Sequence, residues 1–182
     1  MRFGRSGTDT TAADILARLI AEAEEIHRDR RSPVQDPAQA AVEQDPLIPL
    51  FNRRAFLREL VRFMDFSARY NMKSSAILLQ LNGLAEIERH EGYEGCEEAL
   101  RHVADLLIRN VRSSDVIARV AHDAFAVILV EAPLDAAAAK AASLATLIAS
   151  HPLHFASSTI LLSLSHAAQA MPRPAEGRRP PA

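Results

Sequence analysis

Residues 112–130, RSSDVIARVAHDAFAVILV, decide the fold of this chain. They predict a strand over residues 116–120, a tight reversal at residues 121–123 and a second strand over residues 124–130. The second strand is almost entirely apolar, which is typical of a strand that is covered on both faces of its sheet. Two short strands around a tight reversal form a β-hairpin, so this stretch is expected in the middle of a sheet.

Apolar residues recur at helical or strand spacing on both sides of this hairpin. A first helix is predicted from caps at residues 9–11 to about residue 27. Further helices are predicted at residues 53–70, 84–90, 94–112 and 134–150, and further strands at residues 75–81, 151–155 and 159–165. The fold class is therefore α/β or α+β, with a single mixed central β-sheet flanked by helices.

The chain divides into four segments. An amphipathic helix occupies residues 1–30, a Pro-containing linker residues 31–44, one domain residues 45–170, and a Pro-rich tail, expected to be disordered, residues 171–182. The apolar stripe of the helix needs a partner surface, because an isolated helix of this length is marginal in water. It could dock on its own domain or pair with a second copy, and the intervening linker favours a homodimer.

Composition excludes several classes of protein. The net charge of −2 argues against a dedicated nucleic-acid binder. The single cysteine, Cys96, excludes an internal disulfide and a cysteine-based zinc site. The N-terminus lacks the apolar core of a signal peptide, and no apolar run is long enough to span a bilayer. A soluble, cytoplasmic protein is expected.

Two motifs carry a family resemblance. Residues 45–56, DPLIPLFNRRAF, resemble the D-x-L-T-G-L-x-N-R-R-x-F opening motif of GGDEF domains, the diguanylate cyclase family, and AHDAF at residues 121–125 stands where the family has its signature. The resemblance runs in register from Asp45 to about Ala167. It implies a mixed sheet flanked by helices, similar to adenylyl cyclase and polymerase palm domains.

The resemblance also implies that the family's catalysis is lost. Joining two GTP molecules needs divalent cations, which prefer carboxylate ligands. The family's two strand aspartates are replaced by Gln80 and Asn82, and its signature glutamate by Ala124, so no Mg²⁺ is expected. Asp123 alone keeps a carboxylate, at the position that the family uses to help deprotonate the hydroxyl.

The phosphate-binding and base-binding positions differ as well. The two signature glycines, which let the backbone approach phosphates, are Ala121 and His122 here. Glu88 and Glu97 stand where the family reads guanine with Asn and Asp. The family's last helix, with its A-L-Y-x-A-K pattern, is absent, which predicts an exposed apolar patch that a partner could cover.

One functional element of the family is retained. Arg112 and Asp115 form its R-x-x-D inhibitory site, at the family's spacing from the signature. An Arg fork can donate to guanine O6 and N7, and an Asp can accept from guanine N1–H, so cyclic di-GMP is the implied ligand. A purely structural interpretation is also open, because Arg suits a helix C-terminus and Ser-Ser-Asp is ordinary turn chemistry.

Three functions remain. The first is an inactive GGDEF-like regulator that binds cyclic di-GMP at Arg112 and Asp115 and acts through a protein partner. The second is an interaction or dimerisation module that binds no nucleotide. The third is a weak cyclase or GTP binder, against which the substitutions at Gln80 and Ala124 argue. We expect the first.

Overall fold

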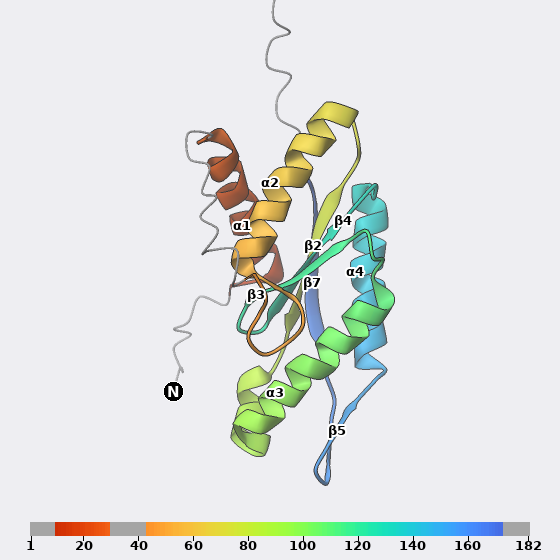
Figure 1. Cartoon of the computed structure of the whole chain (residues 1–182). Coiled ribbons are helices and arrows are strands. Elements are labelled where there is room, and N and C mark those ends of the chain that lie inside the picture. The colour runs from red at the N-terminus through yellow and green to blue at the C-terminus, as the bar shows by residue number, and fades with distance from the viewer. Residues whose placement is uncertain (1–9, 30–42, 173–182) are drawn as a thin grey trace, which may run out of the picture.

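The central sheet of the computed structural model, which describes residues 10–29 and 43–172, has five strands in the order β1-β3-β4-β2-β7 (Figure 1). Strand β1 is parallel to β3, and every other neighbouring pair is antiparallel. The strands are β1 (Phe51–Asn52), β2 (Ser75–Leu81), β3 (Val116–Ala121), β4 (Ala124–Leu129) and β7 (Leu164–Ala170). The predicted mixed sheet is therefore confirmed.

The predicted hairpin is formed by β3 and β4. A β-bulge interrupts its register between Arg119 and Ala121, next to the reversal. Every residue of β4 is buried, as its apolar sequence predicts. Because β4 lies between β3 and β2 in the middle of the sheet, the reversal is held at a fixed place at the sheet's end.

Two helices cover each face of the sheet (Figure 1). Helices α1 (Ala12–Arg28) and α2 (Arg53–Tyr70) cover one face, and α3 (Leu84–Asn110) and α4 (Leu134–Ala149) the other. Helix α3 bends at Gly92, whose φ of 75° is the left-handed conformation that glycine adopts without steric cost. The two helices predicted at residues 84–90 and 94–112 are thus the two arms of one bent helix.

Helix α1 begins with a capping box. Thr11 accepts a hydrogen bond from the Asp14 amide, and the Asp14 carboxylate accepts one from the Thr11 amide. The apolar stripe packs on the chain's own domain, against α2, β2 and β7, and four of its side chains are buried: Leu16, Leu19, Ile20 and Ala23.

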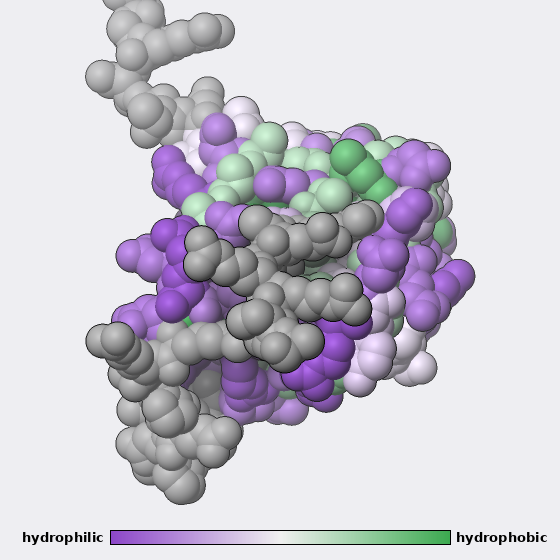
Figure 2. Space-filling view, turned by 90° about the horizontal axis from the view of Figure 1, so that it is seen from above, coloured by the Kyte–Doolittle hydropathy of each residue, from purple (hydrophilic) through white to green (hydrophobic). Residues whose placement is uncertain are grey.

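This docking corrects two predictions. The apolar stripe of α1 is covered by its own domain and not by a second copy of the chain. The structure thus has the alternative that the sequence left open, docking of the helix on the domain. The exposed apolar patch on the sheet that the sequence predicted is not seen either, because within residues 10–29 and 43–172 helices cover both faces of the sheet. From above, apolar side chains lie among hydrophilic ones (Figure 2).

The C-terminal strands differ from the prediction. Residues 153–160 form a separate two-stranded hairpin, β5 (Leu153–Phe155) and β6 (Ser158–Ile160), and residue 164 begins β7, which pairs with β2. The sequence LSHAAQA of β7 has small and polar residues in place of a large apolar run, as suits an edge strand. Its hydrophobic pattern therefore does not predict a strand. No helix follows β7 as far as residue 172, where the description ends.

Two other predictions concern parts of the chain that are only partly described. Residues 1–9, most of the predicted linker (residues 30–42) and the tail from residue 173 lie outside the described residues. No helix within residues 10–29 and 43–172 has the length and apolarity to cross a membrane.

Candidate functional site

Four of the six positions that the family resemblance assigns to catalysis lie in one cleft at the end of the sheet. Gln80 at the end of β2, Asn82 beyond it, and His122 and Asp123 on the β3–β4 reversal line a cavity of about 670 Å³. Thr10 and Thr11, at the start of α1, line the same cavity. The family register thus predicted the assembly of the cleft, but not that the N-terminal helix reaches it.

The polar groups of this cleft are bonded to one another. The Gln80 amide donates to the Asp123 carboxylate at 3.1 Å. Asn82 donates to the Ser163 hydroxyl at 3.3 Å and accepts from the Ser165 hydroxyl at 2.9 Å. These contacts occupy groups that a bound metal or triphosphate would need.

Ala124 takes no part in the cleft surface. It is fully buried in the core that α1 and α2 share with the sheet, so no ligand atom stands at the position of the family's signature glutamate. Among the described residues, no three His, Cys, Asp or Glu side chains are grouped as a metal site requires. The chemistry of this residue set does not fit the metal that the family implies.

The charge of the cleft also opposes a nucleotide. Asp123, Glu86 and Glu88 line it, whereas His122 is the one basic residue among the described residues of its lining. Arg89 pairs with Glu86 at 3.4 Å on the exposed surface. A triphosphate without its metal would meet like charge here. Ala121 and His122 also add side chains where the family has glycines.

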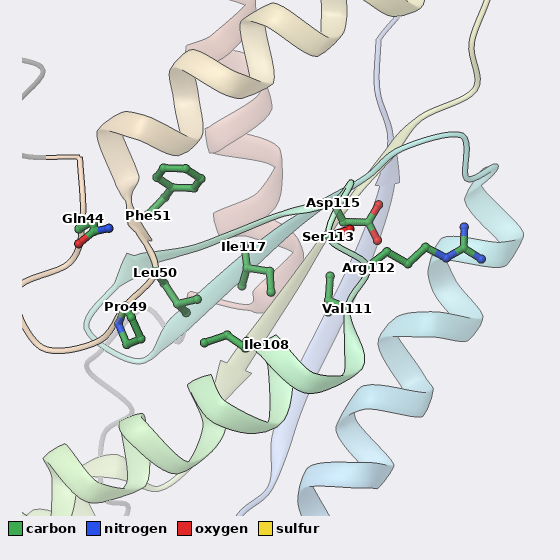
Figure 3. A pocket seen from close by; sticks show the side chains of 10 residues that line it. All are labelled: Gln44, Pro49, Leu50, Phe51, Ile108, Val111, Arg112, Ser113, Asp115 and Ile117. Atoms are coloured by element: carbon green, nitrogen blue, oxygen red, sulfur yellow. The ribbon is translucent and has the colours of Figure 1, made fainter.

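A second cavity contains the retained R-x-x-D residues (Figure 3). It has a volume of about 390 Å³ and lies between the end of α3, the start of β3 and the loop before α2. Most of its lining is apolar, and Arg112, Ser113 and Asp115 supply polar groups at one end. The apolar lining residues are Pro49, Leu50, Phe51, Ile108, Val111 and Ile117.

Arg112 and Asp115 differ in their availability. One Asp115 carboxylate oxygen accepts the Val130 amide at 3.1 Å, and the Asp115 amide donates to the Arg112 carbonyl at 3.0 Å. The Arg112 side chain is exposed and has no ion-pair partner within the described part of the chain. It extends towards α4, away from Pro49 and Leu50 (Figure 3). A structural role therefore explains one carboxylate oxygen of Asp115, which bonds the Val130 amide. It does not explain the Arg112 guanidinium, which has no such contact among the described residues.

The opening motif builds the wall of this second cavity. The Asp45 carboxylate accepts the Leu47 and Ile48 amides at 2.9 and 3.3 Å, which fixes the two-proline turn. Arg119, largely buried, donates to Asp45 at 3.4 Å and to the His122 carbonyl at 2.7 Å. Asp45 and Arg119 thus connect the opening motif to the reversal by hydrogen bonds. The spacing of the two residues in the sequence did not predict this contact.

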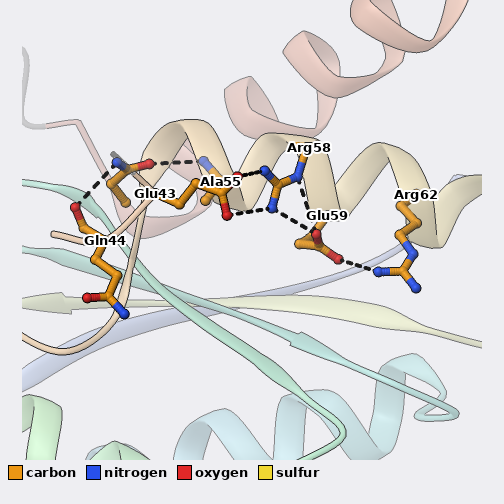
Figure 4. Close-up of polar contacts among 7 residues, drawn as sticks. Glu43, Gln44, Ala55, Arg58, Glu59 and Arg62 are labelled. Atoms are coloured by element: carbon orange, nitrogen blue, oxygen red, sulfur yellow. Dashed lines mark hydrogen bonds and ion pairs between the residues drawn. The ribbon is translucent and has the colours of Figure 1, made fainter. Parts of the chain in front are cut away.

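Glu43 fastens the same loop to α2 (Figure 4). It forms an ion pair with Arg58 through both carboxylate oxygens, one of them at 3.1 Å. The Arg58 hydrogen bond lowers the pKa of Glu43 below its ordinary value. The Asn52 side chain caps α2 by accepting the Ala55 amide at 3.0 Å. Glu43 was not predicted to contact the domain, because it lies in the predicted linker.

The comparisons with known proteins agree with this geometry. The profile of the family described as "Diguanylate cyclase, GGDEF domain" matches residues 42–178. Among curated proteins, none has a sequence that matches this one with significance.

Several solved structures have the same fold. A sensory box/GGDEF family protein from Caulobacter crescentus CB15 is 23% identical with a TM-score of 0.68, over 71% of this chain and 84% of that one. The GGDEF domain of DgcB from Caulobacter crescentus, in complex with c-di-GMP, is 20% identical with a TM-score of 0.66, over 70% and 74%.

A third similar structure is the diguanylate cyclase SiaD in complex with its activator SiaC from Pseudomonas aeruginosa. It is 18% identical with a TM-score of 0.68, over 86% of this chain and 62% of that one. At these identities the structures establish the fold, while the profile match covers most of the sequence. The chain belongs to the GGDEF-domain family of diguanylate cyclases.

Proposed function

We propose that this protein is a catalytically inactive GGDEF regulator that binds cyclic di-GMP at Arg112 and Asp115 and acts through a protein partner. The observation that carries the proposal is the contrast between its two cavities. The catalytic cleft has lost its acidic metal ligands and bonds its remaining polar groups internally, whereas Arg112 stays exposed beside an apolar cavity.

The chemistry of the second cavity suits a guanine dinucleotide. Arg112 can donate to a guanine edge or a phosphate, and the carboxylate oxygen of Asp115 that does not bond Val130 can accept from guanine N–H groups. The apolar lining residues, among them Phe51 and Ile117, offer a surface on which a base can pack. DgcB, of the same fold, has been solved in complex with c-di-GMP, and SiaD in complex with an activator protein.

Calorimetric titration of the full chain with cyclic di-GMP tests the ligand. We expect binding by the wild type and a loss of at least about tenfold in Arg112→Ala and in Asp115→Asn, since a hydrogen bond to a charged group contributes roughly 1.5–3 kcal/mol. The Asn variant keeps an acceptor for the Val130 amide and so isolates the charge. Arg109→Ala, which removes an exposed arginine one turn earlier on α3, is the matched control and should bind like the wild type.

Incubation with GTP and Mg²⁺ or Mn²⁺ tests the inactivity. We expect no cyclic di-GMP at any enzyme concentration, by mass spectrometry. Turnover would contradict the inactive assignment, and a folded protein that gives no heat with cyclic di-GMP would exclude the receptor. The second outcome would leave a nucleotide-independent interaction module.

A further inference from the structure

One face of α2 combines exposed arginines with exposed aromatic rings. We call Arg58, Arg62, Phe66, Arg69 and Tyr70 the outer face of α2. All five are exposed, and their spacing of three or four residues places them side by side along the helix. The Phe66 and Tyr70 rings stack with centroids 5.9 Å apart, and the Arg62 guanidinium lies 5.6 Å from the Phe66 centroid.

This face is basic in a protein whose net charge is −2. Two acidic side chains form ion pairs with its arginines, and a third, Asp65, lies three residues after Arg62 on α2 and contacts His27 at 3.5 Å. Glu59, from α2 itself, contacts Arg58 at 3.2 Å and Arg62 at 3.3 Å, and Glu43 contacts Arg58 from the loop outside the helix (Figure 4). Arg69 has no ion-pair partner within residues 10–29 and 43–172. Within these residues, Arg69 is therefore the arginine of this face that is left unpaired, and it lies beside Tyr70.

Glu43 shows what chemistry the face accepts. Its carboxylate engages the Arg58 guanidinium through two oxygens, which is the geometry that an acidic residue of another protein would use. Exposed ion pairs are weak, so a partner carboxylate can replace Glu43 at small cost. Exposed aromatic rings and arginines are also the side chains that dominate binding energy in protein interfaces.

We propose that the outer face of α2 docks an acidic helical segment of a partner protein, and that Glu43 is an intramolecular competitor for Arg58 at one end of this surface. Carboxylates of the partner would pair with Arg58, Arg62 and Arg69, and an apolar side chain would pack on Phe66 and Tyr70. This deepens the partner role in the proposed function and rests on that role, not on the binding of cyclic di-GMP.

The position of Glu43 gives the competition a link to the second cavity. Its neighbour Gln44 lines that cavity and pairs with Phe51 in an isolated β-bridge, while the Glu43 carbonyl accepts the Asn52 amide at 2.8 Å. The same short stretch of chain therefore holds Glu43 on Arg58 and forms part of the cavity wall.

The test uses the full chain and a defined probe. The probe is a fluorescein-labelled amphipathic helical peptide with Glu at every fourth position and Leu on the adjacent stripe, and its twin carries Gln in place of Glu. Fluorescence anisotropy should show binding of the Glu peptide, about two- to fivefold tighter binding by Glu43→Gln, and at least about tenfold weaker binding by Arg58→Glu/Arg62→Glu. Arg89→Glu/Arg109→Glu, the same charge change on α3, should bind like the wild type.

Each other outcome overturns the proposal. Equal binding of the Gln twin, no gain in Glu43→Gln, or unchanged binding by Arg58→Glu/Arg62→Glu would do so. Sedimentation tests two other occupants. If vesicles rich in phosphatidylserine bind the protein and the peptide does not, the face binds lipid. If the protein self-associates and the double variant does not, the face binds a second copy of the chain. No dinucleotide is present, so failure here is separate from failure of the calorimetric test.

Discussion

The catalytic cleft and the R-x-x-D cavity lie on one domain but have kept opposite properties. In the cleft, Gln80 bonds Asp123 and Asn82 bonds two serines, so the polar side chains satisfy one another. In the cavity, one carboxylate oxygen of Asp115 accepts the Val130 amide, and the Arg112 side chain has no ion-pair partner among the described residues. Polar groups that bond one another are less available to a ligand, whereas an exposed donor remains available.

The difference also has a structural cause. The cleft borders α1, whose first turn forms part of its wall, and its former glutamate position is now a core alanine. The cavity borders the loop of residues 43–52, which is held by hydrogen bonds, by the ion pair of Glu43 with Arg58 and by the buried side chains of Ile48 and Leu50. The position of the family glutamate therefore lies in the core, whereas Arg112 and Asp115 lie at the surface.

The largest expected effect comes from restoring the family glutamate. Ala124→Glu places a carboxylate at a position with 0% exposure and no basic partner, which we expect to destabilise the fold by about 3–5 kcal/mol. Urea denaturation measures it, with Ala121→Glu, on the half-buried side of the same reversal, as control. If Ala124→Glu were as stable as the wild type, the cleft would open more readily than its burial indicates.

Helix α1 gives the next largest effect. Leu19→Ala removes a fully buried side chain from the contact of α1 with the domain and should cost about 2–4 kcal/mol. Because α1 forms a wall of the cleft and not of the R-x-x-D cavity, affinity for cyclic di-GMP should stay within about twofold of the wild type at temperatures where the variant is folded.

Calorimetry on the folded Leu19→Ala variant checks this separation. Arg18→Ala, on the exposed side of α1, is the control and should change neither stability nor affinity. A parallel fall of stability and affinity in Leu19→Ala would mean that the two sites are coupled through α1.

Most of the fold could be predicted because strong local patterns agreed with the family register. The apolar run of β4, the stripe of α2 and the Thr11 cap of α1 each appear in the structure as the sequence indicates. The surface on which α1 packs could not be predicted. An amphipathic stripe indicates that a helix packs against some surface, but does not identify that surface. Strand β7 was misplaced because edge strands carry a weak apolar signal.

The candidate sites were predictable only in part, since a motif fixes identity and spacing but not contacts. Gln80, Asn82, His122 and Asp123, which the family register singled out, line one cavity, while their role stays a prediction. The register could not show that Asp115 caps the Val130 amide, nor that Glu43 reaches Arg58 across 15 positions. Such long-range contacts depend on the folded arrangement of loops, which local patterns do not encode.

A smaller effect separates the two residues of the cavity. Asp115→Ala leaves the half-buried Val130 amide without its acceptor and should cost about 1 kcal/mol of stability, while Arg112→Ala should cost less than about 0.5 kcal/mol. Thermal unfolding followed by circular dichroism distinguishes them. Equal losses would show that Arg112 also supports the fold, which would weaken its assignment to a ligand.

The smallest effect is a pH dependence at the edge of each site. The pKa of Glu43, by the cavity, is lowered by its hydrogen bond from Arg58, and the pKa of Asp14, by the cleft, is lowered by its hydrogen bonds from Thr11. A carboxyl group with a lowered pKa in the folded state stabilises the fold above its ordinary pKa and loses that contribution as the pH falls through the lowered value. Both contacts should therefore persist at neutral pH and weaken only in the acidic range below the ordinary values of 4.5 and 3.8.

NMR titration of the two carboxyl carbons measures both contacts in one sample. Glu43→Gln should remove the titration at the cavity and leave that of Asp14 unchanged, and Asp14→Asn should do the reverse, because the two groups lie at different sites. Salt should shift the Glu43 midpoint, which depends on an ion pair with the exposed Arg58, more than that of Asp14, which depends on uncharged donors. Equal salt sensitivity would contradict this distinction between an ion-paired loop and a capped helix.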